Sequence, residues 1–249
     1  MRVKPWIAGL CLLALAASLP AAADTCITRA THRDAFTMMG QSQPASDDTA
    51  TIWLGTDRIA MSGGSTNAIV RLDQSKVYLL NQEAKVYHVL ALPIDLAKLM
   101  DPKDPNAQMV QQMLEMMKST ASVTPTEERK PIGAWNARLY HAVIQNSMMT
   151  FKSEIWATTD LKLTYPSYRA LDEALLSLNP ATKDAAAEFR KIEGLPVLEE
   201  QTVAVMGSEM KMSEKTLAVR DGAAPAGTYD PPSGYTAKPF NLLQAMQRQ

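Results

Sequence analysis

The chain has 249 residues, of which 46% are hydrophobic and 20% are charged, and its formal net charge is -1. This near balance excludes the basic excess that is typical of nucleic-acid-binding proteins, so we expect no nucleic-acid partner. With only two cysteines, the protein must be stabilised by a core and not by a disulfide framework.

The first 23 residues have the pattern of a cleavable signal peptide. Arg2 and Lys4 form a positive start, residues 7–19 are apolar, and the small residues 21–23 precede the expected cleavage site. The apolar run is shorter than the roughly 20 residues that span a bilayer, which disfavours a membrane anchor. We therefore expect a periplasmic protein that is not an integral membrane protein.

Cys26 is the only cysteine expected in the mature chain, so no intramolecular disulfide forms there. A lipid anchor on Cys26 is disfavoured, because Thr25 stands where bacterial lipoproteins have a small residue. Cleavage after residue 23 removes Arg2 and Lys4 from the 25 basic residues and none of the 26 acidic ones, which leaves the mature chain slightly acidic.

From residue 26 to residue 90, short alternating runs are separated by turn residues, a pattern that predicts antiparallel strands joined by hairpins. The expected strands span 26–38, 51–54, 58–62, 68–73, 76–80 and 85–90. A polar loop is expected at 41–48. Ala68, Val70 and Leu72 share one strand face, as in a sheet with one wet side.

The middle of the chain changes to a helical period, and the expected helices span 94–100, 106–118, 167–178 and 181–191. The helix at 106–118 follows Asp104, a favourable N-cap, and Pro105, which suits the first helical position. Its apolar residues, many of them methionines, recur at spacings of one, three and four, so this helix should pack on an apolar surface.

Strands resume in the second half, and the expected ones span 123–128, 135–144, 149–158, 197–206 and 209–220. Together these elements predict an α+β fold, in which helices inserted mid-chain cover the concave face of a large curved antiparallel sheet that forms a half-open barrel. Residues 24–236 are expected to form one domain. Residues 237–249 would be a C-terminal tail with a short helix at 241–246.

No catalytic constellation is present in the sequence. The three histidines, His32, His88 and His141, lack the spacing of a metal site. No nucleophile elbow occurs, and the carboxylate pairs 127–128 and 199–200 point to opposite strand faces. We therefore expect no enzyme, no metal and no cofactor.

Methionine is frequent, with 15 residues in the chain. Surfaces rich in methionine adapt to apolar ligands of variable shape. Two groups of thioethers would also suit copper(I), which is a third hypothesis for the function: Met113, Met116 and Met117, or Met206, Met210 and Met212. Ordinary apolar packing explains the same residues with fewer assumptions.

Several short segments follow one another in an order that carries a family resemblance. These segments are the meander 53–89, the motif EIW at 154–156 with Asp160, the sequence EGLPV at 193–197, and the closing GTYDPPSGY at 227–235. The order resembles that of the LolA-like superfamily of envelope proteins, most of all its uncharacterised members that carry a domain of unknown function. The resemblance covers about residues 26–236. It implies an unclosed antiparallel barrel with helices at its mouth, which in the carrier members shelters the acyl chains of lipoproteins.

These observations favour a periplasmic, non-enzymatic binding protein or carrier for an apolar or amphipathic ligand such as a lipid or acyl chain. The ligand would lie between the concave sheet face and the helix at 106–118. The expected lining residues are Trp53, Met109, Met113, Phe151, Trp156 and Met206. The alternation of the strand leaves open which face Trp156 takes. The alternative is a structural or protein-interaction module with a filled core, which meets an envelope partner through exposed strand edges.

Overall fold

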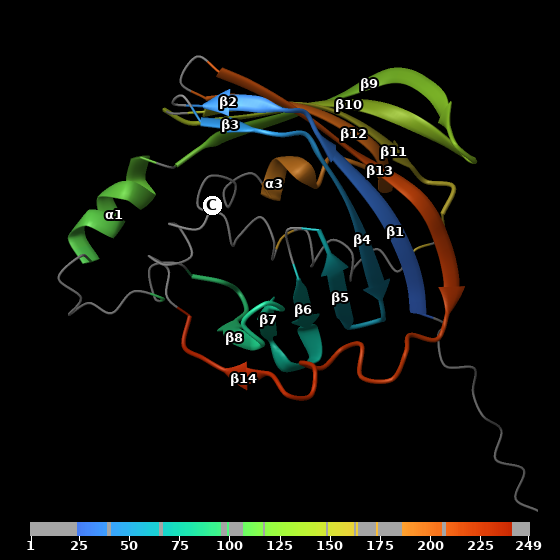
Figure 1. Ribbon diagram of the computed structural model, residues 1–249. Coiled ribbons are helices and arrows are strands. Elements are labelled where there is room, and N and C mark those ends of the chain that lie inside the picture. The colour runs from blue at the N-terminus through green and yellow to red at the C-terminus, as the bar shows by residue number, and fades with distance from the viewer. Residues whose placement is uncertain are drawn as a thin grey trace, which may run out of the picture.

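One large curved sheet dominates the computed structural model (Figure 1). The residues that the structure describes are 24–38, 41–64, 67–95, 99, 107–116, 118–147, 149–161, 163, 173, 186–205 and 208–240. The expected signal peptide and the expected helices at 167–178 and 241–246 lie outside them, apart from residue 173.

The strands follow one another in two groups along the chain. The first group is β1 (Asp24–Arg33), β2 (Phe36–Met38), β3 (Gln41–Gln43), β4 (Ser46–Leu54), β5 (Arg58–Gly63), β6 (Ala68–Arg71), β7 (Lys76–Asn81) and β8 (Val86–Ala91). The second is β9 (Thr120–Ile132), β10 (Trp135–Gln145), β11 (Met149–Thr158), β12 (Leu195–Val205), β13 (Ser208–Gly222) and β14 (Thr236–Ala237). Two α-helices are described, α1 (Ala107–Met116) and α3 (Ala186–Phe189), together with a 3-10 turn at Leu72–Gln74.

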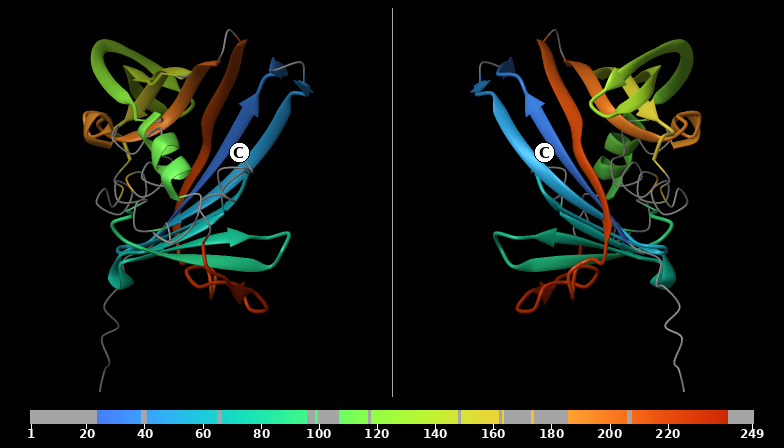
Figure 2. Two further views of the ribbon diagram at one scale, coloured as in Figure 1. Left: turned by 90° about the vertical axis from the view of Figure 1, so that its left-hand side faces the viewer. Right: turned by 90° about the vertical axis from the view of Figure 1, so that its right-hand side faces the viewer.

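Twelve strands form one sheet in the order β14-β8-β7-β6-β5-β4-β1-β13-β12-β11-β10-β9, and β2 pairs with β3 alone. Within the runs β4–β8 and β9–β13, strands that follow one another in the chain pair antiparallel, and β1 joins the two runs by pairing with both β4 and β13. A register shift follows Thr28 in the pairing of β1 with β13. The sheet bends strongly around this central seam, so that its two halves face each other across the concave side (Figures 1 and 2).

Apolar side chains fill the concave face at both ends of the sheet. In the β4–β8 half, a buried cluster includes Ile27, Ile52 and Val77, and Leu163 and Leu195 join it from outside this half. In the other half, Tyr140 and Ile155 lie in a second cluster that packs against Phe189 of α3 and against Ile192. The helix α3 therefore lies inside the curve, beneath β9–β12 (Figure 1).

The outer face of the β5–β8 region is covered by coil and not by a helix. Residues 223–240, here called the C-terminal strap, run along it, and Tyr229 is buried against Ala60 and Ile69. Arg71 anchors the strap, because its Nη1 donates to Asp230 Oδ1 (2.9 Å) and to the carbonyl of Tyr229 (3.3 Å). Beyond β14, which pairs in parallel with β8, Phe240 packs against the concave-face cluster, so the strap passes around β8.

The prediction of an α+β half-open barrel with covering helices is wrong. The fold is β-rich, and its one large sheet is open, with β14 and β9 as its two edges. The helix expected at 106–118 does form as α1, but it stands at the open side of the curve, and Ser147 Oγ donates to the Met116 carbonyl at 3.1 Å. Of the helix expected at 181–191, four residues form α3. The C-terminal strap covers part of the outer face, whereas the covering helices were expected on the concave face.

Most strands predicted from the sequence are present in the structure, but several are longer than predicted. The expected loop at 41–48 contributes β3 and the start of β4, and the expected strand at 123–128 is part of the longer β9. Among the described residues, no helix has both the length and the apolar character that a membrane crossing requires.

Candidate functional site

The concave face carries a band of polar side chains between its two apolar clusters. Glu199 of β12 and Glu214 of β13 are direct partners in the register. Arg29 Nη1 donates to Glu214 Oε1 at 2.7 Å, and the Arg29 side chain is only 13% exposed. Burial, and next the charge of Glu214, raise the pKa of Glu199, whereas a hydrogen bond with Ser153 and the charge of Arg29 oppose this. The band thus combines a partly buried ion pair with a carboxyl group whose pKa is raised.

A row of apolar side chains continues the concave face beyond this band. By alternation along the strands, its members share the face of Ile155 and Glu199. We call this row the apolar strip, and its members are Met149, Phe151, Val203, Val205, Met210 and Met212. Phe151, Val203 and Met210 are opposite one another in the register of three neighbouring strands. Val203 is buried, whereas Phe151 and Met210 are only half-buried, so the strip keeps apolar surface exposed.

Trp53 and Trp156, two of the residues predicted to line the ligand site, do not face the concave side. Trp53 alternates with the concave-face residues Ile52 and Leu54 and packs against the outer cluster that contains Tyr229. Trp156 is 2% exposed and belongs to another outer cluster, where the ammonium of Lys130 lies 3.8 Å from its ring centroid. Neither side chain can contact a ligand in the concavity.

Of the other predicted lining residues, only Phe151 has a described side chain, and it belongs to the apolar strip. Met109 and Met113 lie on α1, but their side chains are outside what the structure describes, as is all of Met206. Met210 and Met212 share a strand face, as the copper hypothesis requires, and that hypothesis stays a prediction.

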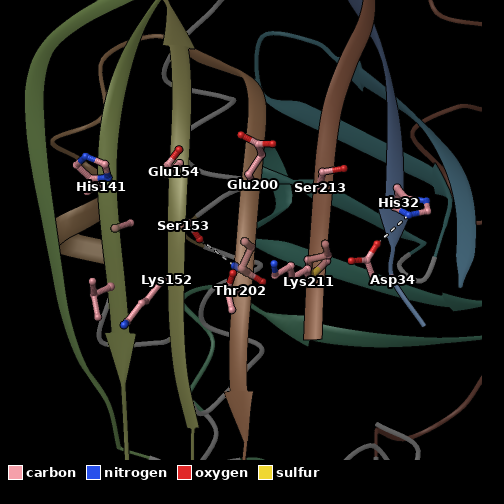
Figure 3. A pocket seen from close by; sticks show the side chains of 14 residues that line it. His32, Asp34, His141, Lys152, Ser153, Glu154, Glu200, Thr202, Lys211 and Ser213 are labelled. Atoms are coloured by element: carbon pink, nitrogen blue, oxygen red, sulfur yellow. Dashed lines mark hydrogen bonds and ion pairs between the residues drawn. The ribbon is translucent and has the colours of Figure 1, made fainter. Parts of the chain in front are cut away.

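The outer face of the same strands carries a groove that the sequence did not indicate (Figure 3). The groove has a volume of about 540 Å³ and crosses β10, β11, β12, β13 and β1. Its charged and imidazole side chains include His32, His141, Lys152, Glu154, Glu200 and Lys211. Figure 3 shows that these residues come from neighbouring strands and lie side by side across the sheet.

Strand register orders these side chains into two parallel rows. His141, Glu154, Glu200, Ser213 and His32 are successive partners across five strands and form an acidic row. A second row lies parallel to the acidic row, two residues away from it along each strand. We call it the basic row, and its members, which are again register partners, are Val143, Lys152, Thr202 and Lys211. The groove therefore presents carboxylates along one side and ammonium groups along the other.

His32 lies at one end of the groove, where each of its two ring nitrogens is close to a carboxylate oxygen. Its Nδ1 lies 2.8 Å from Asp47 Oδ1 and its Nε2 lies 3.1 Å from Asp34 Oδ1. The hydrogen bond with Asp47 is the main cause that raises the pKa of His32; desolvation opposes it, and the hydrogen bond with Asp34 raises the pKa further. Among the described residues, no group of three or more His, Cys, Asp or Glu side chains has the geometry to hold a metal ion.

Comparison with known proteins leaves this chain without an assigned family. No family model matches the sequence. No curated protein matches it either. Among solved structures, the chain is similar to PNGF-II, with a TM-score of 0.37 and 12% sequence identity over 89% of this chain and 32% of that chain. The chain thus spans less than half the length of PNGF-II, and a likeness at this level carries no argument about function. The LolA-like resemblance stays a prediction.

Fold and site together define the class of this molecule. It is a protein built on one open, strongly curved antiparallel sheet that offers two distinct polar surfaces. One is the polar band beside the apolar strip on the concave face, and the other is the charged groove on the outer face.

Proposed function

We propose that this protein is an exported, non-enzymatic binding protein or carrier that holds an apolar or amphipathic ligand, such as a lipid or acyl chain, against its concave sheet face. Export rests on the signal-peptide pattern of residues 1–23. Binding rests on the apolar strip and not on the tryptophans that the sequence suggested.

The observation that carries this proposal is the partial exposure of the apolar strip. Phe151 and Met210 face the concave side of the sheet and are only half-buried, although the central residues of the neighbouring clusters on the same face are buried. Burial of apolar surface releases about 25 cal/mol per Å², so a ligand tail gains affinity by covering these side chains without any directional chemistry. Methionine suits this role because its flexible thioether adapts to chains of different shape.

The polar band supports an amphipathic ligand over a purely apolar one. Arg29, Glu199 and Glu214 lie on the same face as the strip and next to it in the register. A ligand tail along the strip would place a polar head group close to these side chains. Burial of a polar head beside hydrogen-bonding groups is less costly than burial in a purely apolar site.

The test is to purify the exported protein gently and to identify any bound lipid by native mass spectrometry. After lipid removal, binding of dansyl-labelled undecanoic acid is measured by fluorescence. Met210→Asp removes contact on the strip and introduces a charge there, so we expect probe affinity to fall by at least about tenfold, which corresponds to 1.4 kcal/mol.

Leu217→Asp provides the matched control, because Leu217 lies on the same strand but is 54% exposed and outside the strip. Circular dichroism must show that both variants fold. A protein that is repeatedly free of lipid and does not bind the probe would refute the carrier function, as would equal losses in the two variants.

The rival function is an interaction module that binds a partner through exposed strand edges. The two edge strands of the sheet support it less well than the apolar strip supports a carrier. The edge strand β9 contains Pro125 and Pro131, and four charged residues lie between them at 127–130. Proline and charge on an edge strand oppose the addition of a further strand. The other edge, β14, has only two residues.

A further inference from the structure

We propose that the groove on the outer face is a second binding site, separate from the concave face, and that it takes a short zwitterionic peptide of two residues. The peptide carboxylate would lie at the basic row, near Lys152 and Lys211, and its ammonium group at the acidic row, near Glu154 and Glu200. This inference does not depend on the carrier function.

The first support is that the four charged side chains have no ion-pair partners. Within the part of the chain that the structure describes, none of Lys152, Glu154, Glu200 and Lys211 forms an ion pair. Other charged residues of the same sheet do pair, as in Arg138 with Glu127 (3.0 Å) and Arg29 with Glu214 (2.7 Å). The groove therefore holds opposite charges that are left available to a ligand.

The second support is that two carboxylates are direct neighbours across two strands. Glu154 is the register partner of Glu200, and like charges at such positions destabilise a sheet. A cation placed between them removes this repulsion. An ammonium group, with three donors, fits such a position, and a metal ion lacks the ligand set described above.

The third support is the distance between the two rows. Same-face residues two apart on a strand are separated by about 7 Å, because a strand rises about 3.4 Å per residue. An extended dipeptide spans about the same length between its termini. The hydroxyl groups of Thr202 and Ser213 lie within the rows and offer hydrogen bonds to the peptide unit. The volume of about 540 Å³ lies in the range of small-molecule sites.

The experiment is isothermal titration calorimetry of the full exported chain with Ala-Ala and with the same dipeptide capped by an N-acetyl and a C-amide group. We expect saturable binding of Ala-Ala that weakens at high salt, and a loss of at least about tenfold when either terminus is blocked. Lys211→Met and Glu200→Gln should each weaken binding by about tenfold.

Two matched controls lie on β13 and on the same face as Lys211 but outside the groove. These are Lys215→Met and Glu209→Gln, and both should bind Ala-Ala like the unaltered protein. Three results would overturn the proposal: no saturable heat with Ala-Ala, equal binding of the capped dipeptide, or equal losses in the control variants. Sedimentation velocity supplies a further test, because a dimer that buries the groove and is broken by Lys211→Met would assign these charges to self-association instead.

Discussion

Glu199 of β12 lies directly opposite Glu214 of β13, and both side chains face the concave side of the sheet. Two ionised carboxylates in this arrangement repel each other. Arg29 Nη1 donates to Glu214 Oε1 at 2.7 Å. Burial and the charge of Glu214 raise the pKa of Glu199, which is therefore the carboxyl group that retains a proton.

Stability should fall as pH rises through the interval between the ordinary pKa of a glutamate and the raised pKa of Glu199. In this interval the folded state binds more protons than the unfolded state, so the free energy of unfolding decreases with pH. Glu199→Gln mimics the protonated form and should flatten this dependence in urea unfolding measured at several pH values. Glu200→Gln changes the next residue of β12, whose side chain faces the outer side of the sheet, and should leave the pH dependence unchanged. An unchanged slope in Glu199→Gln would contradict the assignment.

His32 gives a pH dependence of the same sign. Its pKa is raised, chiefly by the hydrogen bond with Asp47, so its contribution to stability is present at low pH and is lost as pH rises through the raised pKa. Asp47→Asn should lower the pKa of His32 in an NMR titration, and Asp34→Asn should lower it less. The reverse order would show that Asp34 is the dominant partner.

Loss of the Asp230 carboxylate should loosen the C-terminal strap. Asp230 accepts from Arg71, and the strap amides of Thr236 and Lys238 donate to the carbonyls of Lys85 and Tyr87. Because Asp230 is 69% exposed, Asp230→Ala should reduce the free energy of unfolding by less than about 1 kcal/mol.

Hydrogen exchange at the two strap amides is the more sensitive measurement, and Asp230→Ala should accelerate it. Asp73→Ala is the control, because it removes the other carboxylate that pairs with Arg71 and leaves the strap contact intact. Equal acceleration in both variants would show that the anchor does not act through Asp230.

Gly194, which precedes β12, should not tolerate a side chain. It has a φ of +93°, and a Cβ atom there would collide with the carbonyl oxygen of Thr158. Gly194→Ala should therefore reduce the free energy of unfolding by about 3 kcal/mol or more, measured by urea unfolding. Gly234→Ala is the comparison, since Gly234 has a φ of +86° but no atom within 4 Å of the added Cβ. It should cost only about 1 kcal/mol, and similar losses at both positions would exclude the clash as the cause.

Alternation in the sequence predicted which residues share a strand face, but it did not predict which face is concave. Trp53 and Ile52 are neighbours on β4, but Ile52 lies in the concave-face cluster and Trp53 packs on the outer cluster that contains the distant Tyr229 of the strap. A pattern of period two is the same for either orientation. The predicted lining residues therefore included two outward tryptophans and missed Met210 and Met212 as parts of the strip.

The outer groove was beyond sequence reasoning for a related reason. His32 lies beside Ser213 only because β1 pairs with β13, a contact between opposite ends of the chain. Glu154 and Glu200 are neighbours through a similar long-range register. A sequence motif consists of residues that are close in the chain. Each charged row instead takes one residue from each of several strands, so no motif indicates it. The charges could be counted in the sequence, but their alignment could not.

The position of β1 in the centre of the sheet has a consequence for the order of folding. Asp24 pairs with Gly222, so the two halves of the sheet are not joined until nearly the whole chain is available. Contacts over such separations form slowly, because a long loop must close before they contribute. Under the export proposed above, this delay would leave β1 without its partner β13 until the C-terminal part of the chain has crossed the membrane.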